Sequence, residues 1–168
     1  MDLKPILQGI LSANASAFVE AGTPPGRVEL TPGLLPAWDD CCQGQLYLRV
    51  REVFPTGPFP SFDSAQKGVN SACAIKLLSV SFAVGMMRCA ATLDDNGNSP
   101  TPEQVSADGN LMLDDMNTIL QTLVCTVPTI KGIQSLKMDR WVPQGVNGGC
   151  HGGEWGAMIA VDPCLCKP

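Results

Sequence analysis

The sequence predicts an α+β fold, in which helices pack on a mostly antiparallel sheet in the order α-β-β-α-β-β. Three observations support this small single-domain α/β sandwich. The chain has 168 residues, and one domain usually holds about 100–200 residues. Hydrophobic residues make up 45% and charged residues 16%, which is enough apolar surface for a core. Segments with helical spacing also alternate with segments of period two. We therefore expect residues 1–168 to form one domain.

Residues 1–22 predict an amphipathic N-terminal helix. Asp2 stands where it can cap this helix, Pro5 fits the first turn, and Gly22 marks the end. The apolar residues recur on one helical face, and they are Leu3, Ile6, Leu7, Ile10, Leu11, Phe18 and Val19.

A Pro/Gly-rich link is expected over residues 23–36, followed by a strand near residues 46–50 with one buried and one wet face. Residues 54–62 then predict a loop, because prolines lack the N–H donor that strands need. The loop carries Phe54, Phe59 and Phe62. These rings either fold back on the core or dock a partner, since apolar groups on loops often mark contact sites.

The middle of the chain predicts a second strand over residues 74–88, whose small Ser and Gly face packs closely on another element. A helix is expected to follow, running from Pro102 to about Cys125. Thr101 and Gln104 match a capping box. The helix is predicted to bury Val105, Met112, Met116, Ile119 and Leu123, and to leave Asp108, Asp114 and Asp115 in water.

The last forty residues predict a β-hairpin, with strands near residues 136–142 and 155–161. Between them, residues 143–154 are expected to form a long, flexible, glycine-rich loop. Asn147 and His151 lie in this loop. Because glycine neighbours hold a side chain poorly, we expect His151 to be a solvated loop residue.

Eight cysteines are the feature that stands out by count. We expect Cys73, Cys89 and Cys125 to be buried thiols, because they fall on or beside core elements. The candidate disulfide cysteines lie in expected loops or at the terminus, and they are Cys41, Cys42, Cys150, Cys164 and Cys166. Zinc knuckles have two to four residues between paired cysteines, and this spacing does not occur here, so no metal is expected.

Composition and motifs argue against an enzyme. His151 is the single histidine, whereas most general-base mechanisms need a positioned histidine. The adjacent aspartate pairs cannot face each other, and no phosphate-binding motif occurs, so no catalytic residue and no cofactor are expected. The net charge is −5 without a Lys/Arg cluster, which disfavours DNA binding. No signal peptide and no membrane span are expected.

Several short blocks occur in a characteristic order over about residues 38–162. They are Trp38-Asp39-x-Cys41, Gly44-Gln45-Leu46, Phe54-Pro55 with Phe59-Pro60, Arg88-Cys89-Ala90, Asp95-x-Gly97 before Pro102, Asp115, Cys125 and Gly148-Gly149-Cys150-x-Gly152. Together they resemble the small head-to-tail connector and tail terminator proteins of phages of mycobacteria and related actinobacteria, which are mycobacteriophage-like siphophages. Residues 1–36 do not match these blocks, and the Cys164-x-Cys166 tail differs from the family pattern.

The resemblance implies a structural protein of the virion that is assembled in the host cytoplasm. Such a protein forms a homo-oligomeric ring, expected to be a hexamer, on the end of the tail tube. The ring stops polymerisation of the tail tube protein and docks to a head-completion or stopper protein. The acidic charge suits a lumen through which DNA only passes.

The candidate assembly contacts are Phe54, Phe59, Phe62, Asn147 and His151. Two other functions stay open from the sequence. One is a head-completion stopper or adaptor of the phage neck, for which we expect more β structure and a small barrel. The other is a secreted cystine-rich binding protein, which the eight cysteines suggest.

Overall fold

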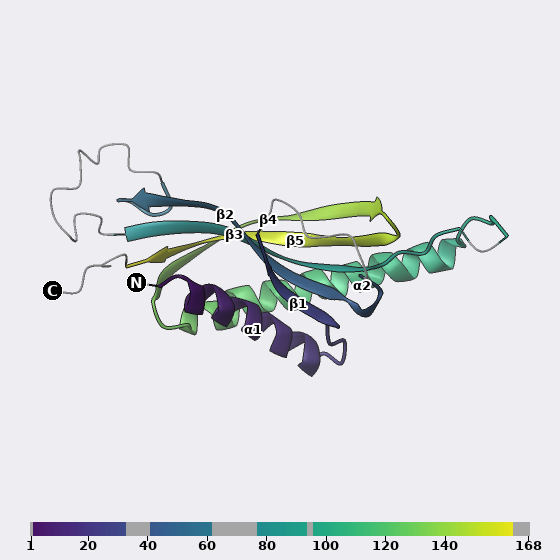
Figure 1. Cartoon of the computed structure of the whole chain (residues 1–168), viewed down its shortest axis with the longest axis horizontal. Coiled ribbons are helices and arrows are strands. Elements are labelled where there is room, and N and C mark those ends of the chain that lie inside the picture. The colour runs from purple at the N-terminus through teal and green to yellow at the C-terminus, as the bar shows by residue number, and fades with distance from the viewer. Residues whose placement is uncertain (1, 33–40, 62–76, 94–95, 163–168) are drawn as a thin grey trace.

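The chain is a small single-domain α+β protein with a five-stranded mixed sheet and two helices (Figure 1). A computed structural model describes residues 2–32, 41–61, 77–93 and 96–162. The helices are α1 (Lys4–Glu20) and α2 (Pro102–Gln121), with short turns η1 (Cys41–Gln43), η2 (Thr122–Thr126) and η3 (Val127–Thr129). The strands are β1 (Arg27–Thr31), β2 (Gln45–Thr56), β3 (Leu77–Cys89), β4 (Ile133–Asn147) and β5 (Cys150–Val161).

The strands lie in the order β1-β2-β3-β5-β4, so β1 and β4 form the two edges of the sheet. The β1–β2 pair is parallel and the other three pairs are antiparallel, so the sheet is mostly antiparallel, as predicted. Strand β1 falls inside the expected link over residues 23–36, so three strands precede α2 instead of the expected two. Residues 27–31 do alternate polar and apolar side chains, but the surrounding prolines and glycines predicted a link. Pairing with β2 supplies the hydrogen bonds that make this segment a strand.

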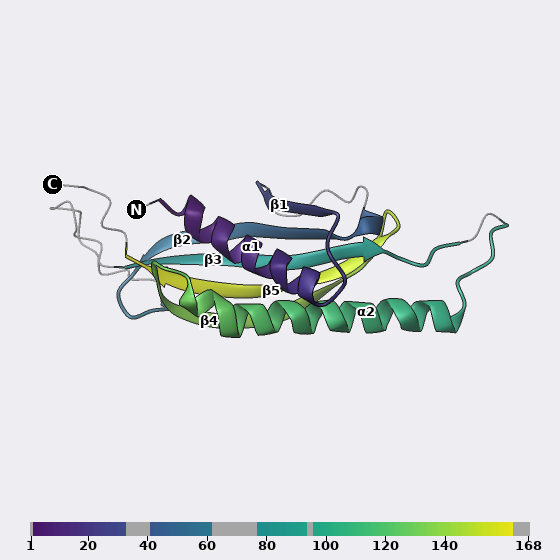
Figure 2. The ribbon, with the colours of Figure 1, turned by 90° about the horizontal axis from the view of Figure 1, so that it is seen from below.

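Both helices cover the same face of the sheet (Figure 2). The main core lies between them and the sheet, and its fully buried members include Ile10, Phe18, Leu46, Leu48, Val80, Phe82, Val84, Met86, Ile119, Leu123 and Ile159. Alternate residues of β3 therefore form one apolar face of the sheet. Val19, which was predicted to belong to the apolar face of the N-terminal helix, is 61% exposed.

Helix α1 confirms the predicted N-terminal helix. The Asp2 carboxylate accepts a hydrogen bond from the Lys4 backbone N–H at 3.0 Å. After the helix, Gly22 takes a positive φ of 76°, a conformation that glycine adopts without steric cost. Both ends of the helix therefore follow from local residues.

Helix α2 begins with the predicted capping box. Thr101 Oγ1 accepts from the Gln104 backbone N–H at 3.3 Å, and Gln104 Oε1 accepts from the Thr101 N–H at 2.8 Å. At its other end the helix passes into the π-helical turn η2 and then η3. The helical segment therefore runs somewhat beyond Cys125.

Replacing Thr101 by Ala should lower the free energy of unfolding by about 1 kcal/mol, because one N–H at the helix start loses its acceptor. Thr101→Ser keeps an acceptor and should stay close to the wild type. Urea unfolding followed by circular dichroism measures both values. Equal midpoints for the Ala and Ser variants would contradict a stabilising capping box.

The predicted apolar stripe of α2 is buried only in its C-terminal half. Ile119 and Leu123 are fully buried, Met116 is half-buried and Val105 is 54% exposed. The first turns of α2 project past the end of the sheet (Figures 1 and 2). The stripe therefore continues along the helix where no strand covers it.

Strand β2 is longer than predicted and includes part of the expected phenylalanine loop. It continues to Thr56, and Pro55 is paired with Leu78 of β3. Strand β1 borders β2 only as far as Arg49. Within the described residues no strand borders the later part of β2 on that side, and a missing N–H is tolerated at such an edge.

Candidate functional site

A buried ion cluster lies on the face of the sheet that the helices leave open. Glu154 of β5 is 2% exposed, and its carboxylate accepts hydrogen bonds from two arginines of β2. Arg49 donates from Nε at 2.9 Å and from Nη2 at 2.6 Å, and Arg51 donates from Nη2 at 2.6 Å. Tyr47 donates its hydroxyl to the same carboxylate at 3.2 Å. One carboxylate thus joins β5 to β2 across β3.

The charges of this cluster determine its protonation. Burial alone raises the pKa of Glu154, but the hydrogen bonds and charges of Arg49 and Arg51 outweigh burial and hold this pKa below its usual value. Burial, together with the neighbouring Glu154 charge, raises the pKa of Tyr47 far above its usual value. The carboxylate is therefore ionised and the phenol protonated at neutral pH, as the observed hydrogen bonds require.

Glycines make room for the side chains that cross this face. A Cβ at Gly85 would collide with the Tyr47 ring, and a Cβ at Gly156 would lie 2.6 Å from Arg51 Nη1. The small face of β3 therefore packs closely on a neighbour, as the sequence predicted.

A second buried ion pair joins the sheet to α2 on the helix-covered face. Arg88 donates to Asp115 from Nε at 2.7 Å and from Nη2 at 2.8 Å, and its guanidinium lies 5.9 Å from the Phe18 ring centroid. Asp115 is 4% exposed, so the prediction that it stays in water was wrong. Burial raises the pKa of Asp115, and the nearby Arg88 only partly offsets this effect.

An apolar groove opens beside this pair, between the projecting half of α2 and the tip of the β4–β5 hairpin. It has a volume of about 390 Å³. Exposed apolar residues on its two sides include Val105 and Val146. His151 also lines it, and Nε2 of this buried side chain has no hydrogen-bond partner among the described residues. We call this feature the α2 groove, and it belongs to the β4 edge of the sheet.

A different apolar surface lies at the β1 edge. Val19 of α1 and Val28 of β1, which is 44% exposed, border a hollow of about 440 Å³ together with Ala15 and Pro25. We call this surface the α1–β1 patch. It shares no residue with the α2 groove, and the two features lie at opposite edges of the strand order.

Four cysteines meet near the hairpin turn. Disulfides join Cys41 to Cys150 and Cys42 to Cys89. Cys89 was predicted to be a buried free thiol, and this is wrong because β5 places Cys150 beside it and η1 brings Cys42 to it. Cys125 was also predicted to be buried, but it is exposed and free.

The remaining predicted cysteines lie outside the part of the chain that the structure describes. They are Cys73, Cys164 and Cys166.

The candidate contact residues do not form one site. Phe54 is buried in β2 and Phe59 is half-buried, whereas Phe62 lies outside the described residues. Asn147 is exposed at the end of β4. His151 is buried in β5, so its prediction as a solvated loop residue was wrong.

The flexible loop that was predicted over residues 143–154 is also wrong. Most of it is strand, and the connection is the two-residue turn Gly148–Gly149, with φ of 58° and 80°. Among the other glycines, Gly153 lies under the Trp141 indole and Gly152 lies against the Met86 backbone, whereas Gly145 has open space where a Cβ would be.

Sequence reasoning missed both ion clusters, although a signal existed for one of them. Arg88 continues the alternation of Val84 and Met86 on the buried face of β3, and Asp115 stands four residues before buried Ile119. A buried arginine needs a carboxylate partner. The position of Arg88 in the strand repeat and that of Asp115 in the helical repeat therefore indicate the pair together. Glu154 gave no comparable signal, because it lies in a segment that resembled a loop.

No family model and no curated protein matches the chain. Within the described residues, the helices are too short or too polar to cross a lipid bilayer.

Proposed function

We propose that the chain is a structural subunit that assembles into a ring at the phage head–tail junction, where it caps the tail tube as a tail terminator. The sequence blocks that resemble the connector and tail terminator family support a role at the head–tail junction. The observation that carries the assembly itself is the pair of unlike apolar surfaces at the two edges of the sheet, namely the α2 groove and the α1–β1 patch.

Contact between unlike surfaces of identical chains is head to tail, and such contacts give closed rings when the rotation between subunits closes. The α2 groove offers apolar side chains on a projecting helix and one unpaired imidazole nitrogen. The α1–β1 patch offers valines that the helix layer does not cover. An apolar centre with few polar groups is typical of protein interfaces. We propose that the groove of one subunit holds the patch of the next, in a ring of six.

The open sheet supports the terminator role over the stopper role, because a stopper is expected to contain a small barrel. The ring then ends polymerisation of the tail tube protein and presents one side to a head-completion protein. Its net charge of −5 favours passage of DNA without adhesion. No catalytic role enters this proposal.

Paired surface variants test the contact. Val105→Asp in the α2 groove and Val28→Asp in the α1–β1 patch should each give monomers, since a buried unpaired charge opposes association. Val124→Asp is the matched control, because Val124 is 50% exposed and lines neither surface. Light scattering after size exclusion measures the oligomer, and circular dichroism confirms that each variant is folded.

A mixture of the two charged variants gives the sharper result. Each variant keeps the surface that the other has lost, so a head-to-tail contact predicts 1:1 dimers and no rings. A monomeric wild type, or a control that disassembles as fully as the variants, would contradict the contact.

In a phage, loss of the protein should give tails of uncontrolled length. Tails of normal length with heads that leak DNA would favour the stopper or adaptor role instead.

The two disulfides favour one second candidate, a secreted cystine-rich binding protein. Disulfides persist in oxidising compartments, whereas cytosolic thiols are kept reduced. Thiol titration of the denatured protein, isolated with alkylation at lysis, separates the two functions. Eight titratable thiols would remove the secreted function, and four or fewer would favour it.

A further inference from the structure

The four cysteines near the hairpin turn come from three separate elements. Cys41 and Cys42 are adjacent in η1, Cys89 ends β3 and Cys150 begins β5. Cys89 and Cys150 are direct partners in the β3–β5 register. Each disulfide crosses between η1 and the sheet, with Cα–Cα distances of 6.0 Å for Cys41–Cys150 and 4.3 Å for Cys42–Cys89. The fold therefore brings these four cysteines together at one end of the sheet.

We propose that the reduced chain binds one Zn²⁺ through these four cysteines. Tetrahedral zinc has Zn–S distances of about 2.3 Å, which place its sulfur ligands about 3.8 Å apart. The sulfurs of Cys41, Cys42 and Cys89 all lie within 4.8 Å of one another, and the sulfur of Cys150 is bonded to that of Cys41. The sulfur of Cys150 is not part of this group of three, so zinc binding requires its side chain to turn toward Cys42 and Cys89 once its disulfide to Cys41 is open.

The redox chemistry is balanced by a cellular thiol reductant, such as a dithiol protein or glutathione. Reduction of the two disulfides takes four electrons and four protons and gives four thiols. Zinc binds thiolates, so metal binding releases protons from these thiols. Zinc itself changes no oxidation state. In a compartment that keeps thiols reduced, the metal replaces the two covalent links.

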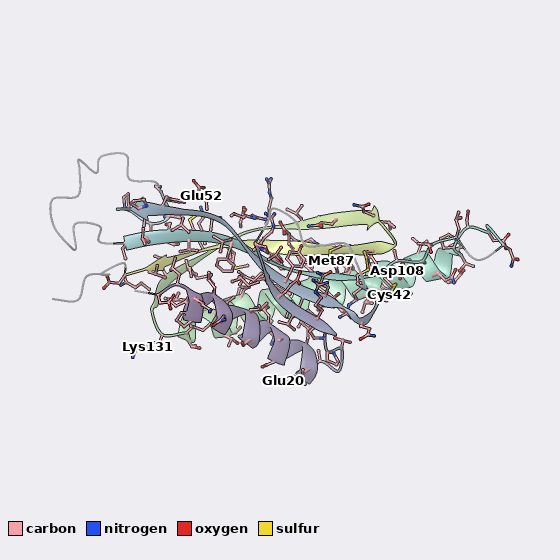
Figure 3. All side chains as sticks on the ribbon, viewed as in Figure 1. Glu20, Cys42, Glu52, Met87, Asp108 and Lys131 are labelled. Carbon is pink, nitrogen blue, oxygen red and sulfur yellow. A yellow bond between two sulfur atoms is a disulfide. The ribbon has the colours of Figure 1, made fainter. Side chains whose placement is uncertain are left out.

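The surroundings of the cluster suit a structural site with an entry path. Cys41 and Cys150 are each 2% exposed and pack with Tyr47 and Met87, whereas Cys42 and Cys89 are exposed. Two ligands are thus held rigidly and two face the solvent from which the ion arrives. In Figure 3, Cys42 and Met87 lie in the same half of the molecule as Asp108 of α2.

A disulfide or a zinc ion that anchors η1 stabilises the start of the sheet at β1. The backbone N–H of Gly26 donates to the Gln43 carbonyl at 2.8 Å, and Arg27 donates to the Gly44 carbonyl at 3.1 Å. Strand β1 therefore begins on the segment that η1 anchors. Without disulfides or metal, η1 keeps only its hydrogen bonds and packing, so the reduced metal-free chain should melt at a lower temperature than the zinc form.

The test uses the full chain, reduced with tris(2-carboxyethyl)phosphine, incubated with zinc sulfate and freed of excess metal. Elemental analysis should give one zinc per chain for the wild type and for Cys125→Ser, the matched control. Cys41→Ser/Cys150→Ser should lose the zinc. The triple variant Cys73→Ser/Cys164→Ser/Cys166→Ser should keep it, because these residues are not ligands. Cobalt substitution should give thiolate-to-cobalt charge-transfer absorption in the wild type.

Several results would overturn the proposal. They are a reduced wild type without zinc, zinc that persists in Cys41→Ser/Cys150→Ser, or zinc that is lost in the triple variant. Since the double variant lacks two packed side chains, Cys42→Ser and Cys89→Ser provide exposed substitutions, each of which should weaken zinc affinity at least tenfold. A chelator should lower the melting temperature of the reduced wild type and leave the disulfide form unchanged. Ring assembly is not a readout, so the result is independent of the proposed function.

Discussion

Glu154→Ala should lower the free energy of unfolding by about 3–5 kcal/mol, because it leaves partly buried arginine charges without their carboxylate. Arg49 and Arg51 both donate to this side chain, and their own side chains are 12% and 24% exposed. Asp139→Ala is the matched control. Asp139 is 60% exposed and lies 3.6 Å from Arg51 Nη1, so its loss should cost no more than about 1 kcal/mol. Urea unfolding measures both.

The pH dependence of Glu154 gives a second readout. Its pKa in the folded chain is below the ordinary value, so its contribution to stability is present above the unfolded pKa of about 4.3. The contribution is lost as the pH falls from there through the folded pKa. Glu154→Gln should therefore show a weaker loss of stability in this acid range than the wild type. Parallel curves for the two proteins would contradict the assigned charge interaction.

Asp115→Ala should also cost about 3–5 kcal/mol, because the partly buried charge of Arg88 would lose its carboxylate partner. Asp114→Ala is the neighbouring control. Asp114 is exposed, and substitutions at such positions usually change stability by less than about 0.5 kcal/mol. Similar melting temperatures for the two variants would contradict a stabilising role of the Arg88–Asp115 pair.

The same pair has a distinct pH signature. Burial raises the pKa of Asp115 in the folded chain, so the stability linked to this group is fully present below its unfolded pKa and declines as the pH rises through the folded pKa. The pH dependence of stability linked to Asp115 therefore runs in the opposite direction to that linked to Glu154.

The double variant Arg88→Met/Asp115→Leu should recover much of the stability that Asp115→Ala loses, since apolar replacement of a buried pair is often neutral.

The two ion clusters add side-chain links between elements that are distant in the sequence. One carboxylate links β5 to β2 across the open face, and one arginine links β3 to α2 on the covered face. Each pair restricts which elements can lie side by side. The two edges of the sheet carry the α2 groove and the α1–β1 patch, which we propose to be assembly surfaces.

The sequence by itself determined those elements whose signals are local. The α2 capping box needs only Thr101 and Gln104, and the α1 stop needs only Gly22. The alternation around Phe82 likewise predicted a buried strand. These signals are reliable because each side chain acts on backbone groups a few residues away or on a single face of one element.

Only the tertiary structure decided the features that depend on a distant partner. Strand β1 exists because β2 supplies its hydrogen bonds, and the glycine-rich segment is mostly strand because β5 pairs with both β3 and β4. Burial of His151 and exposure of Val105 depend on how α2 is placed relative to the end of the sheet. Long-range packing sets these outcomes, and no local pattern encodes the position of an element that is distant in the sequence.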